Sequence, residues 1–404
     1  MQQLKLGIIK EGKVPIDKRV PITPDQCKTI LSEFTGVEIY CQRSNIRCFH
    51  DDEYQQAGAN MVDSVADCDV IIGVKEVPNS MLVDGKTHFF FSHTTKKQEY
   101  NRGLLQTILK KNVKLIDWEG LTNEAGQRLI AFGRYAGIVG AYNGILTYGR
   151  RYNLFHLRPA HECFDMADMQ LEYAKVKLPA IKIVLTGGGR VSKGAMEVLT
   201  GMKIRKVSPI EFLNEYFAEP VYTQLNTRDY NKHIAGGGFS RDEFYRNPTN
   251  YKSNFMQYAR KADVLIAGAF WDPKAPVLFT KEEANESDFN IRIIADITCD
   301  IEGSIPSTKR PSTIDDPVYD YNSSDDKIEA AFTDESNITV MAVDNLPCEL
   351  PRNASEDFGK EFIKYILPNL LTGDKDNIIK RATITENGHL TERYSYLQDY
   401  VDGN

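Results

Sequence analysis

The stretch Ile181-Lys-Ile-Val-Leu-Thr-Gly-Gly-Gly-Arg-Val-Ser-Lys-Gly-Ala-Met-Glu-Val-Leu199 decides the fold, because an apolar strand runs into three glycines and then into a helix. Glycines let the backbone turn tightly and approach a ligand, and the start of a helix presents unpaired N–H groups to an anion. The stretch therefore predicts a dinucleotide-binding domain. Ser192 stands at the third glycine position of Gly-x-Gly-x-x-Gly, so an ordinary glycine-rich turn is the alternative interpretation.

Composition sets the outer limits of the interpretation. The chain has 404 residues, 42% of them hydrophobic, which is enough for two domains with substantial cores. A net charge of −7 without a long basic run disfavours nucleic acid and anionic membranes as partners, and no apolar run is long enough to span a bilayer. Seven scattered cysteines indicate reduced thiols and no zinc site. The chain starts directly with a strand and shows no targeting segment, so we expect a cytoplasmic protein.

Strand-like and helix-like segments alternate along the chain, which is typical of parallel α/β architecture. Strands are predicted at 37–40, 69–74, 88–92 and 113–117, and helices at 25–34 and 102–111. Thr23-Pro-Asp-Gln26 carries the signature of a helix start, with a capping threonine and a proline in the first turn. Residues 128–152 are rich in alanine, glycine and apolar residues and predict a long buried helix that links two lobes.

Three further strands are predicted after the glycine turn, at 264–267, 292–296 and 338–343. Residues 216–263 are too long for a plain loop and predict an insertion with some structure of its own, whereas 322–326 is a disorder-prone tract. A helix over 355–371 is expected to return to the first domain. The predicted fold is α/β, with two Rossmann-like domains, parallel sheets and an active-site cleft between the domains. Residues 1–140 and 346–404 would form the substrate and catalytic domain, and 141–345 the dinucleotide-binding domain.

Six motifs carry a family resemblance, in order and over nearly the whole chain. They are Gly73-Val-Lys-Glu-Val-Pro78, Phe90-Phe-Ser-His-Thr-Thr-Lys-Lys-Gln98, Phe132-Gly-Arg-Tyr-Ala-Gly137, Val191-Ser-Lys-Gly-Ala195, Ala295-Asp-Ile-Thr-Cys-Asp-Ile-Glu-Gly-Ser-Ile305 and Val343-Asp-Asn-Leu-Pro347. Together they resemble the superfamily of alanine dehydrogenase and lysine-forming saccharopine dehydrogenase. Within it, the likeness is to the lysine-ketoglutarate reductase domain of aminoadipic semialdehyde synthase.

The resemblance implies a reductive condensation. The ε-amine of lysine adds to the ketone of 2-oxoglutarate, water leaves to give an imine, and hydride from a nicotinamide coenzyme reduces the imine to saccharopine; the reverse is an oxidative deamination. Such proton transfers need groups with pKa values near neutrality. Lys75 and His93 match the acid/base pair of the family, and Glu119 matches an active-site glutamate. Without the resemblance, a solvated lysine, a packed histidine and a loop carboxylate would be the plainer interpretations.

Substrates that carry several carboxylates need fixed positive partners, and the planar guanidinium of arginine suits a carboxylate well. Arg19 matches the substrate-binding arginine of the family, and Arg128 is a second candidate by the same reasoning. Lys13, Lys96 and Gln98 resemble positions near the substrate or the catalytic pair. For any one of these residues, an exposed position on the surface without a role in binding is the more common case.

The coenzyme would be NADP or NAD. An acid at the end of the strand after the glycine turn usually binds the ribose 2′-hydroxyl, and a basic residue accommodates a 2′-phosphate. That region reads Lys203-Ile-Arg-Lys-Val-Ser-Pro209 and has no acid before Glu211, which favours NADP. The residues predicted to bind the coenzyme are Gly187, Gly189, Arg190, Val191, Ser208, Asp296, Asp344 and Asn345. Arg205 and Lys206 are further candidates for the phosphate, and no metal is predicted.

Two other functions stay open. An alanine dehydrogenase-type amino acid dehydrogenase shares the lysine and histidine pair and the two-domain plan. A non-catalytic nucleotide-binding regulatory protein could be built on the same scaffold. The expected partners are small molecules, namely lysine, 2-oxoglutarate and saccharopine, and a homo-oligomer is left open.

Overall fold

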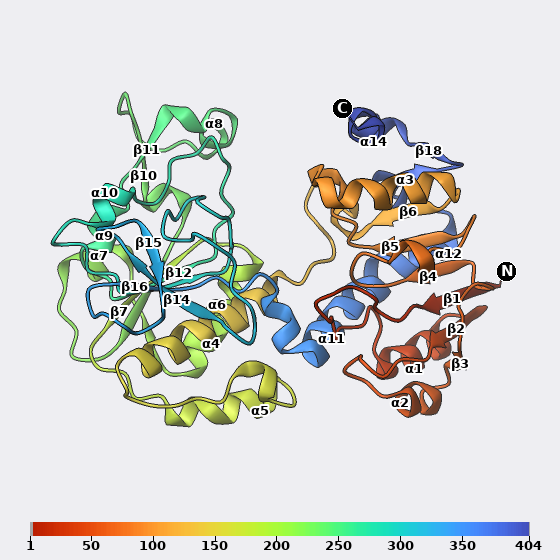
Figure 1. The fold of residues 1–404 in the computed structure, drawn as a ribbon, viewed down its shortest axis with the longest axis horizontal. Helices are drawn as coiled ribbons and strands as arrows, with labels where there is room; N and C mark the ends of the chain where they lie inside the picture. Colours follow the sequence, from red (N-terminus) through yellow and green to blue (C-terminus); the bar gives the residue numbers. More distant parts are fainter. Residues whose placement is uncertain (1–2, 404) are drawn as a thin grey trace. The chain divides into compact units, whose positions relative to one another are not determined.

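The computed structural model describes residues 3–403, which form two compact units (Figure 1). Unit 1 comprises the residues up to Phe132 together with those from Pro351 onward, and unit 2 comprises Gly133–Leu350. Each unit is built on an eight-stranded mixed sheet in which parallel strands dominate. The α/β fold that the alternating pattern predicts is therefore confirmed.

The sheet of unit 1 has the strand order β18-β17-β6-β5-β4-β1-β2-β3. Its strands are β1 (Leu4–Ile8), β2 (Val37–Gln42), β3 (Asn60–Val62), β4 (Val70–Ile72), β5 (Thr87–Phe90), β6 (Lys114–Asp117), β17 (Thr383–Glu386) and β18 (His389–Leu390). The first six strands are parallel, and β17 and β18 extend the β6 edge in antiparallel fashion. The chain adds strands to one side of β1 and then to the other, so the carboxyl ends of β1 and β4 flank a topological switch point.

Helices cover both faces of this sheet. They are α1 (Pro24–Glu33), α2 (Asp51–Gln56), α3 (Arg102–Lys110), α11 (Pro351–Glu361), α12 (Leu367–Thr372), α13 (Ile378–Ala382) and α14 (Gln398–Asp402). A capping box starts α1 as predicted, since Thr23 Oγ1 accepts from Gln26 N while Gln26 Oε1 accepts from Thr23 N. On the other face, Leu105 of α3 and Tyr400 of α14 pack in a common core with strand residues such as Phe90.

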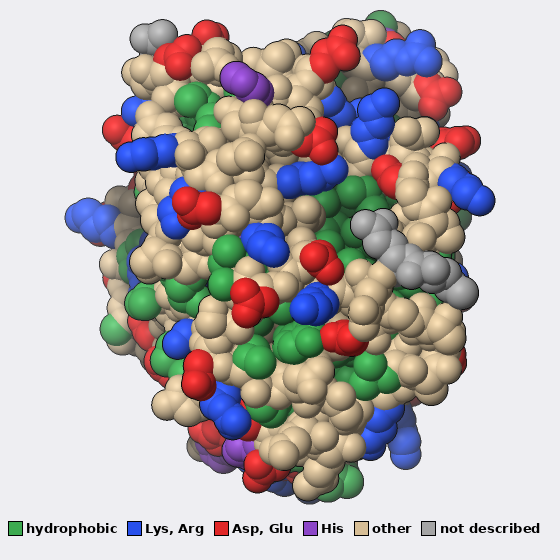
Figure 2. All heavy atoms as spheres, turned by 90° about the vertical axis from the view of Figure 1, so that its right-hand side faces the viewer, with side chains coloured by type: hydrophobic (Ala, Val, Ile, Leu, Met, Phe, Trp, Pro, Cys, Tyr) green, Lys and Arg blue, Asp and Glu red, His purple; other side chains and the backbone are tan. Residues whose placement is uncertain are grey.

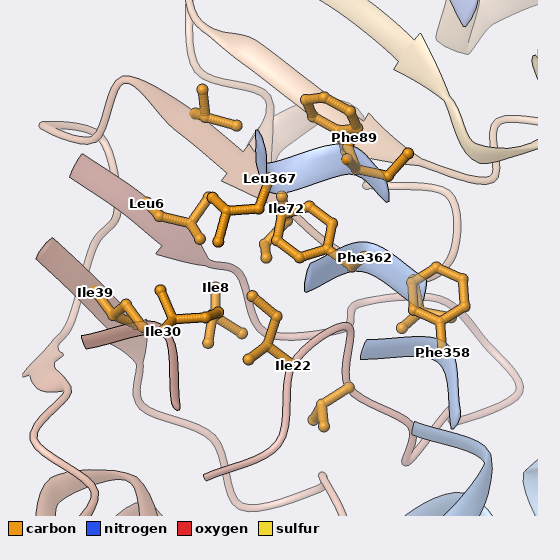
Figure 3. Packing of buried hydrophobic residues seen from close by; sticks show 14 of the residues in the cluster. Leu6, Ile8, Ile22, Ile30, Ile39, Ile72, Phe89, Phe358, Phe362 and Leu367 are labelled. Carbon is orange, nitrogen blue, oxygen red and sulfur yellow. The ribbon is translucent and has the colours of Figure 1, made fainter. Parts of the chain in front are cut away.

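The C-terminal segment completes a core that the N-terminal strands begin. Figure 3 shows Phe358, Phe362 and Leu367 packed among apolar side chains of β1, β2, β4 and α1. A π-helix (Phe362–Ile366) joins α11 to α12 and keeps this apolar stripe facing the sheet. Ile8 and Ile72, in the two strands at the switch point, are at most 1% exposed, so the strand ends beside them start from a rigid base.

The sheet of unit 2 has the order β15-β14-β16-β13-β12-β7-β9-β8. Its strands are β7 (Lys182–Thr186), β8 (Arg205–Lys206), β9 (Val221–Leu225), β12 (Val264–Ala267), β13 (Ile293–Asp296), β14 (Val318–Asn322), β15 (Lys327–Glu329) and β16 (Ile338–Met341). The helices are α4 (Gly133–Arg151), α5 (Met166–Leu171), α6 (Arg190–Gly201), α7 (Pro209–Asn214), α8 (Arg241–Arg246), α9 (Met256–Ala259) and α10 (Lys281–Ala284). Strands β10 (Asn231–His233) and β11 (Tyr251–Ser253) form a separate small sheet, which confirms that the predicted insertion has structure of its own.

Three predictions about local structure need correction. Residues 221–225, counted within the insertion, form β9 of the main sheet. Helix α4 starts at Gly133, five residues later than predicted, because Arg128 pairs with Thr122 in an isolated β-bridge. The tract 322–326 is an ordered turn between β14 and β15, where Asn322 Oδ1 accepts from the backbone of Ser324.

Two glycines bring α4 and α6 into backbone contact within unit 2. A Cβ added to Gly137 of α4 would lie 1.8 Å from the carbonyl oxygen of Val191, and one added to Gly194 of α6 would lie 2.0 Å from that of Arg134. No side chain fits at such distances, so only glycine permits this crossing. The helix that follows the glycine turn is thereby fixed against α4.

The surface mixes charges of both signs. Figure 2 shows acidic and basic side chains interspersed on the face that it presents. Within residues 3–403, none of the helices combines the length and the apolar character needed to cross a membrane. All seven cysteines are free thiols.

Candidate active site

The predicted catalytic side chains follow the parallel strands of unit 1. Lys75 comes three residues after β4, His93 three residues after β5 and Glu119 two residues after β6, while Lys13 and Arg19 lie on the segment after β1. Parallel strands end at the same edge of a sheet, and ligands bind at that edge near the switch point. The fold therefore brings these segments to the place where a site is expected.

Glu76 is the centre of a hydrogen-bonded cluster. Its carboxylate accepts from Lys13 Nζ, at 2.8 Å to each oxygen, and from His93 Nδ1 at 2.6 Å. Burial acts to raise the pKa of Glu76, but the hydrogen bonds from His93 and Lys13 outweigh burial and lower that pKa to about 2. A carboxylate only accepts, so Nδ1 of His93 carries a proton, and Nε2 is the ring nitrogen that Glu76 does not engage.

The ring of His93 is held on two sides. It stacks on Phe91 with 6.3 Å between the ring centroids and 17° between the planes, and Glu76 holds its Nδ1. The backbone of His93 is left-handed, with φ 52° and ψ 12°, which is uncommon for a residue other than glycine. The preceding residue, Ser92, anchors this turn by donating its N–H to Asp117 Oδ2 at 2.9 Å. The imidazole therefore has a single defined orientation.

Lys75 has a lowered pKa. Burial is the main cause, the positive charge of Arg19 adds to it, and the negative charge of Asp17 partly offsets both. Within the described part of the chain, no carboxylate lies within ion-pair distance of Lys75 Nζ. Its backbone is fixed, because Lys75 N donates to Glu11 Oε2 at 3.0 Å. A lysine whose ammonium form is disfavoured and unpaired can act as a base nearer neutrality.

Arg19 and Asp17 form a buried ion pair. The Nε of Arg19 lies 3.0 Å from Asp17 Oδ1, one of its Nη atoms lies 2.6 Å from Oδ2, and the guanidinium stacks 4.1 Å from the centroid of Phe132. Burial acts to raise the pKa of Asp17, but Arg19 outweighs it and holds this pKa below its usual range. Burial, with the charge of Asp17, raises the pKa of the adjacent Glu11 to about 8. Nε and one Nη of Arg19 thus both bind Asp17.

The other predicted site residues of unit 1 have different partners. Glu119 pairs with Arg128 at 3.2 Å. Gln98 accepts from Tyr100 through its side chain and from Tyr400 through its backbone carbonyl. Lys96 is exposed on the short turn after His93. The structure therefore gathers Lys13, Arg19, Lys75 and His93 into one electrostatic cluster and joins Glu119 to Arg128.

Sequence reasoning missed the acids that organise this cluster, namely Glu11, Asp17 and Glu76. The available signal was position, because Glu76 directly follows the candidate base at the end of a buried strand. A buried acid beside two bases is stable only when it is paired. That argument could have assigned Glu76 to His93 or Lys75, but not chosen between them.

The glycine turn of unit 2 fits a dinucleotide. Gly187 has φ +98°, a conformation that favours glycine, and a Cβ there would lie 2.6 Å from Ser192 Oγ. Gly189 caps α6, and a Cβ added to it would meet nothing within 4 Å, so the start of this 12-residue helix is open to an anion. Ser192, at the third glycine position, is buried and donates to the carbonyl of Thr186 at 2.9 Å. Arg190 and Val191 form the first turn of the helix.

A pocket with aromatic walls borders this turn. It lies at the carboxyl ends of β7, β9 and β12, and its lining includes Thr186, Thr227, Tyr230, Tyr245, Ala269 and Trp271. Pockets of planar, mostly apolar side chains with a few polar groups suit a flat heterocycle such as a purine. The residues present thus fit the adenosine half of a nicotinamide coenzyme.

The remaining predicted coenzyme residues differ in their surroundings. Asp296 is buried and accepts from Thr298 Oγ1 at 2.6 Å and Thr308 Oγ1 at 2.7 Å, so it organises its own loop. Asp344 is exposed after β16, and Asn345 follows it. Ser208 caps α7, at the end of β8, and β9 separates β8 from β7.

Ser208 thus follows β8, the next strand along the chain, whereas β9 is the neighbour of β7 on that side of the sheet. Within residues 3–403, no group of three or more His, Cys, Asp or Glu side chains is arranged to hold a metal ion.

Comparisons with known proteins match this architecture. Residues 7–139 match the family "Alanine dehydrogenase/PNT, N-terminal domain", and 164–393 match "Alanine dehydrogenase/PNT, C-terminal domain". The mitochondrial alpha-aminoadipic semialdehyde synthase of Mus musculus is 31% identical over 95% of this chain, which spans only 46% of that relative. The chain thus spans about half the length of such relatives.

A shorter relative matches from end to end. Saccharopine dehydrogenase [NAD(+), L-lysine-forming] of Yarrowia lipolytica is 25% identical over 91% of this chain and 92% of its own length. A solved L-alanine dehydrogenase shares the fold, with a TM-score of 0.67, 17% identity and 99% coverage of both chains. On the evidence of both family matches, which together cover most of its length, the chain belongs to the alanine dehydrogenase/PNT family.

Proposed function

We propose that the chain is a nicotinamide-dependent oxidoreductase that forms saccharopine from L-lysine and 2-oxoglutarate, or runs the reverse reaction. The observation that carries this proposal is the cluster of Lys75, Glu76 and His93, with the cations Lys13 and Arg19 beside it. The likeness to saccharopine dehydrogenase and to aminoadipic semialdehyde synthase supports this choice of substrates.

Two groups of the cluster suit the two proton transfers of the condensation. The amine must lose a proton before it attacks the ketone, and Lys75 can accept that proton because burial and Arg19 lower its pKa. The oxygen of the carbinolamine must gain a proton to leave as water. Because Glu76 holds Nδ1 of His93, Nε2 is the ring atom that can take up a proton and then pass it to that oxygen. General acid–base catalysis of this kind contributes roughly 100- to 10,000-fold to a rate.

The cations of unit 1 suit the carboxylates of the substrates. 2-Oxoglutarate carries two carboxylates, and Lys13 and Arg19 are both on the segment after β1. Each is already paired with an acid of the protein, which fixes its position on this segment. We assign Arg19 the larger role because its guanidinium is rigid and can donate to a carboxylate in a planar geometry.

Unit 2 would hold the coenzyme. Bound there, the coenzyme supplies or accepts the hydride. The open start of α6 at Gly189 would bind the pyrophosphate, and the pocket lined by Tyr245 and Trp271 would bind the adenine. Each unit therefore contributes a different part of the chemistry, proton transfer from unit 1 and coenzyme binding from unit 2.

The test is a paired-substrate assay of NADH and NADPH oxidation. We expect turnover with lysine plus 2-oxoglutarate and little with pyruvate plus ammonia. Preference for pyruvate plus ammonia would instead identify an alanine dehydrogenase-type enzyme. Coenzyme binding without turnover of either pair would identify a nucleotide-binding regulatory protein.

A lysine substitution tests the role of the cluster. Lys75→Met should lower kcat about 1,000-fold, because it removes the base but keeps a side chain of similar length. Lys110→Met is the matched control, since Lys110 is an exposed residue of α3, and it should keep the wild-type rate. Undiminished activity of Lys75→Met would show that the role is wrongly assigned.

A further inference from the structure

The sheet of unit 2 places β9, rather than β8, beside β7. Leu225, at the end of β9, is the register partner of Thr186, and its carbonyl accepts from Gly187 N at 2.8 Å. In dinucleotide-binding sheets, the residues after the strand beside the glycine turn meet the 2′ position of the adenosine ribose. In this chain, those residues are Asn226-Thr-Arg228.

Asn226 directly borders the glycine turn. Gln224 Nε2 donates to the carbonyl of Gly187 at 2.8 Å and to Asn226 Oδ1 at 3.2 Å. A Cβ added to Gly188 would lie only 2.8 Å from the same Oδ1. The position beside the turn is therefore taken by a neutral amide, where a carboxylate would bind the ribose hydroxyls of NAD and repel a 2′-phosphate.

The nearest acid along the chain is engaged with the backbone. Asp229 Oδ2 accepts from Asn226 N at 2.7 Å, which closes the turn Thr227–Asp229. Arg228 Nε lies 3.8 Å from the other oxygen of Asp229, and the Arg228 side chain is 71% exposed. A long, exposed ion pair of this kind contributes little, so the guanidinium can reorient toward a phosphate at small cost.

Two further features agree with a phosphate beside Asn226. Lys206 Nζ lies 3.4 Å from Gln224 Oε1, and Gln224 also binds the glycine turn. Lys206 is therefore a second exposed cation near Asn226. Thr227 belongs to the lining of the aromatic pocket that suits a purine ring. The aromatic pocket and the turn that carries Arg228 are therefore continuous.

We propose that Asn226, Thr227 and Arg228, together with Lys206, form a 2′-phosphate subsite through which the chain selects NADP(H) over NAD(H). The proposal depends on the coenzyme-binding part of the proposed function and is independent of the amino-acid substrate. Arg228 would donate parallel hydrogen bonds to the phosphate, which NAD lacks. The side chain of Asn226 is uncharged, so it would not repel a phosphate beside it.

The test is direct binding to the full chain, measured by titration calorimetry for two matched pairs, NADPH with NADH and 2′,5′-ADP with 5′-AMP. The phosphorylated member of each pair should bind about 100-fold more tightly, as expected for charge-assisted hydrogen bonds. Arg228→Gln should reduce this preference to below about 10-fold and leave the affinity for NADH unchanged. Asn226→Asp, which keeps the shape and adds a charge, should shift the preference toward NADH.

Arg205→Gln tests the competing assignment, because Arg205 is the other arginine that the sequence offers for the phosphate. Arg205 is also an exposed arginine near the sheet edge, but it pairs with Glu219 at 2.9 Å and lies over Phe217. Its replacement should leave both preferences unchanged. The assignment would be wrong if Arg228→Gln lowered the affinities for NADH and NADPH equally. It would also be wrong if Arg205→Gln removed the preference for NADPH and Arg228→Gln did not.

The outcomes separate this proposal from the proposed function. Wild-type protein that binds NADH at least as tightly as NADPH contradicts the subsite and leaves the dehydrogenase intact. Selective binding of NADPH without saccharopine formation supports the subsite and contradicts the proposed substrates. Failure to bind any of the four nucleotides contradicts both.

Discussion

The two units build different sites on similar sheets, and the loop after the first strand accounts for the difference. In unit 2, only three glycines separate β7 from α6, so a helix start and its N–H groups reach the carboxyl edge of the sheet. In unit 1, residues 9–23 separate β1 from α1 and bring Glu11, Lys13, Asp17 and Arg19 to the corresponding edge. The short connection of unit 2 thus presents the N–H groups at the start of a helix, whereas the long connection of unit 1 presents a cluster of charged side chains.

Strand order is the second difference. The parallel strands of unit 1 follow the order β3-β2-β1-β4-β5-β6, so that β2, the next strand along the chain, is also a neighbour of β1 in the sheet. In unit 2, β9 is inserted between β7 and β8. The residues that border the glycine turn therefore follow the end of β9 at Leu225 and not the end of β8 at Lys206, which lies 19 positions earlier in the chain. Chain order alone misidentifies them.

The largest predicted effect is a loss of folding stability when the packing that holds α6 in unit 2 is disturbed. Gly194→Ala should destabilise the protein by about 3 kcal/mol or more, because the added Cβ would lie 2.0 Å from the carbonyl of Arg134. Gly103→Ala, on α3 of unit 1, is the control, since a Cβ there meets nothing within 4 Å. It should stabilise its helix by about 0.5–1 kcal/mol. Denaturant unfolding measures both, and equal effects would contradict the tight helix crossing.

The next effect separates the functions of the two units. Gly189→Val should weaken NADPH binding about 100-fold, because its methyl groups fill the open space at the start of α6, while the extended backbone there accepts valine. His93→Gln in unit 1 should lower kcat and leave the Kd of NADPH unchanged. Fluorescence titration of the coenzyme and steady-state kinetics measure the two quantities. A large loss of NADPH affinity in His93→Gln would show that the functions are not divided in this way.

The smallest predicted effect is a dependence of folding stability on pH that comes from Glu76 of unit 1. The pKa of Glu76 is lowered from 4.5 to about 2 in the folded protein, so the unfolded state binds more protons between these values and stability rises with pH across that window. The stabilisation is complete above pH 4.5 and is lost as the pH falls toward 2. Glu76→Gln should therefore cost about 2 kcal/mol at pH 7 and less at pH 3. A difference that stays constant with pH would contradict the role of its charge.

Local patterns predicted the elements well where the signal is contained in one segment. The strand at 264–267 coincides with β12, and the capping signature at Thr23 is realised at the start of α1. The glycine-rich turn at 187–189 has the strand before it and the helix after it that the motif requires. These features depend on periodicity, capping and backbone freedom, which a few neighbouring residues determine.

Features that depend on distant partners could not be predicted in this way. Nothing in the residues of β8 and β9 shows which strand lies beside β7, because sheet order depends on how the connecting helices pack. The role of Glu76 depends on the turn after β5, which brings His93 Nδ1 to its carboxylate. Asp296 had a suitable position for the coenzyme, but the structure engages its carboxylate with Thr298 and Thr308.

The glycine contact between α4 and α6 has a consequence for engineering. Because Gly137 and Gly194 interlock two backbones, the nucleotide cradle cannot be transplanted as residues 182–201 alone. A donor segment whose residue opposite Gly137 carries a larger side chain would tilt α6 and misalign the turn. Chimeras with relatives should therefore exchange 133–151 and 182–201 together, as one cassette of two helices and a strand.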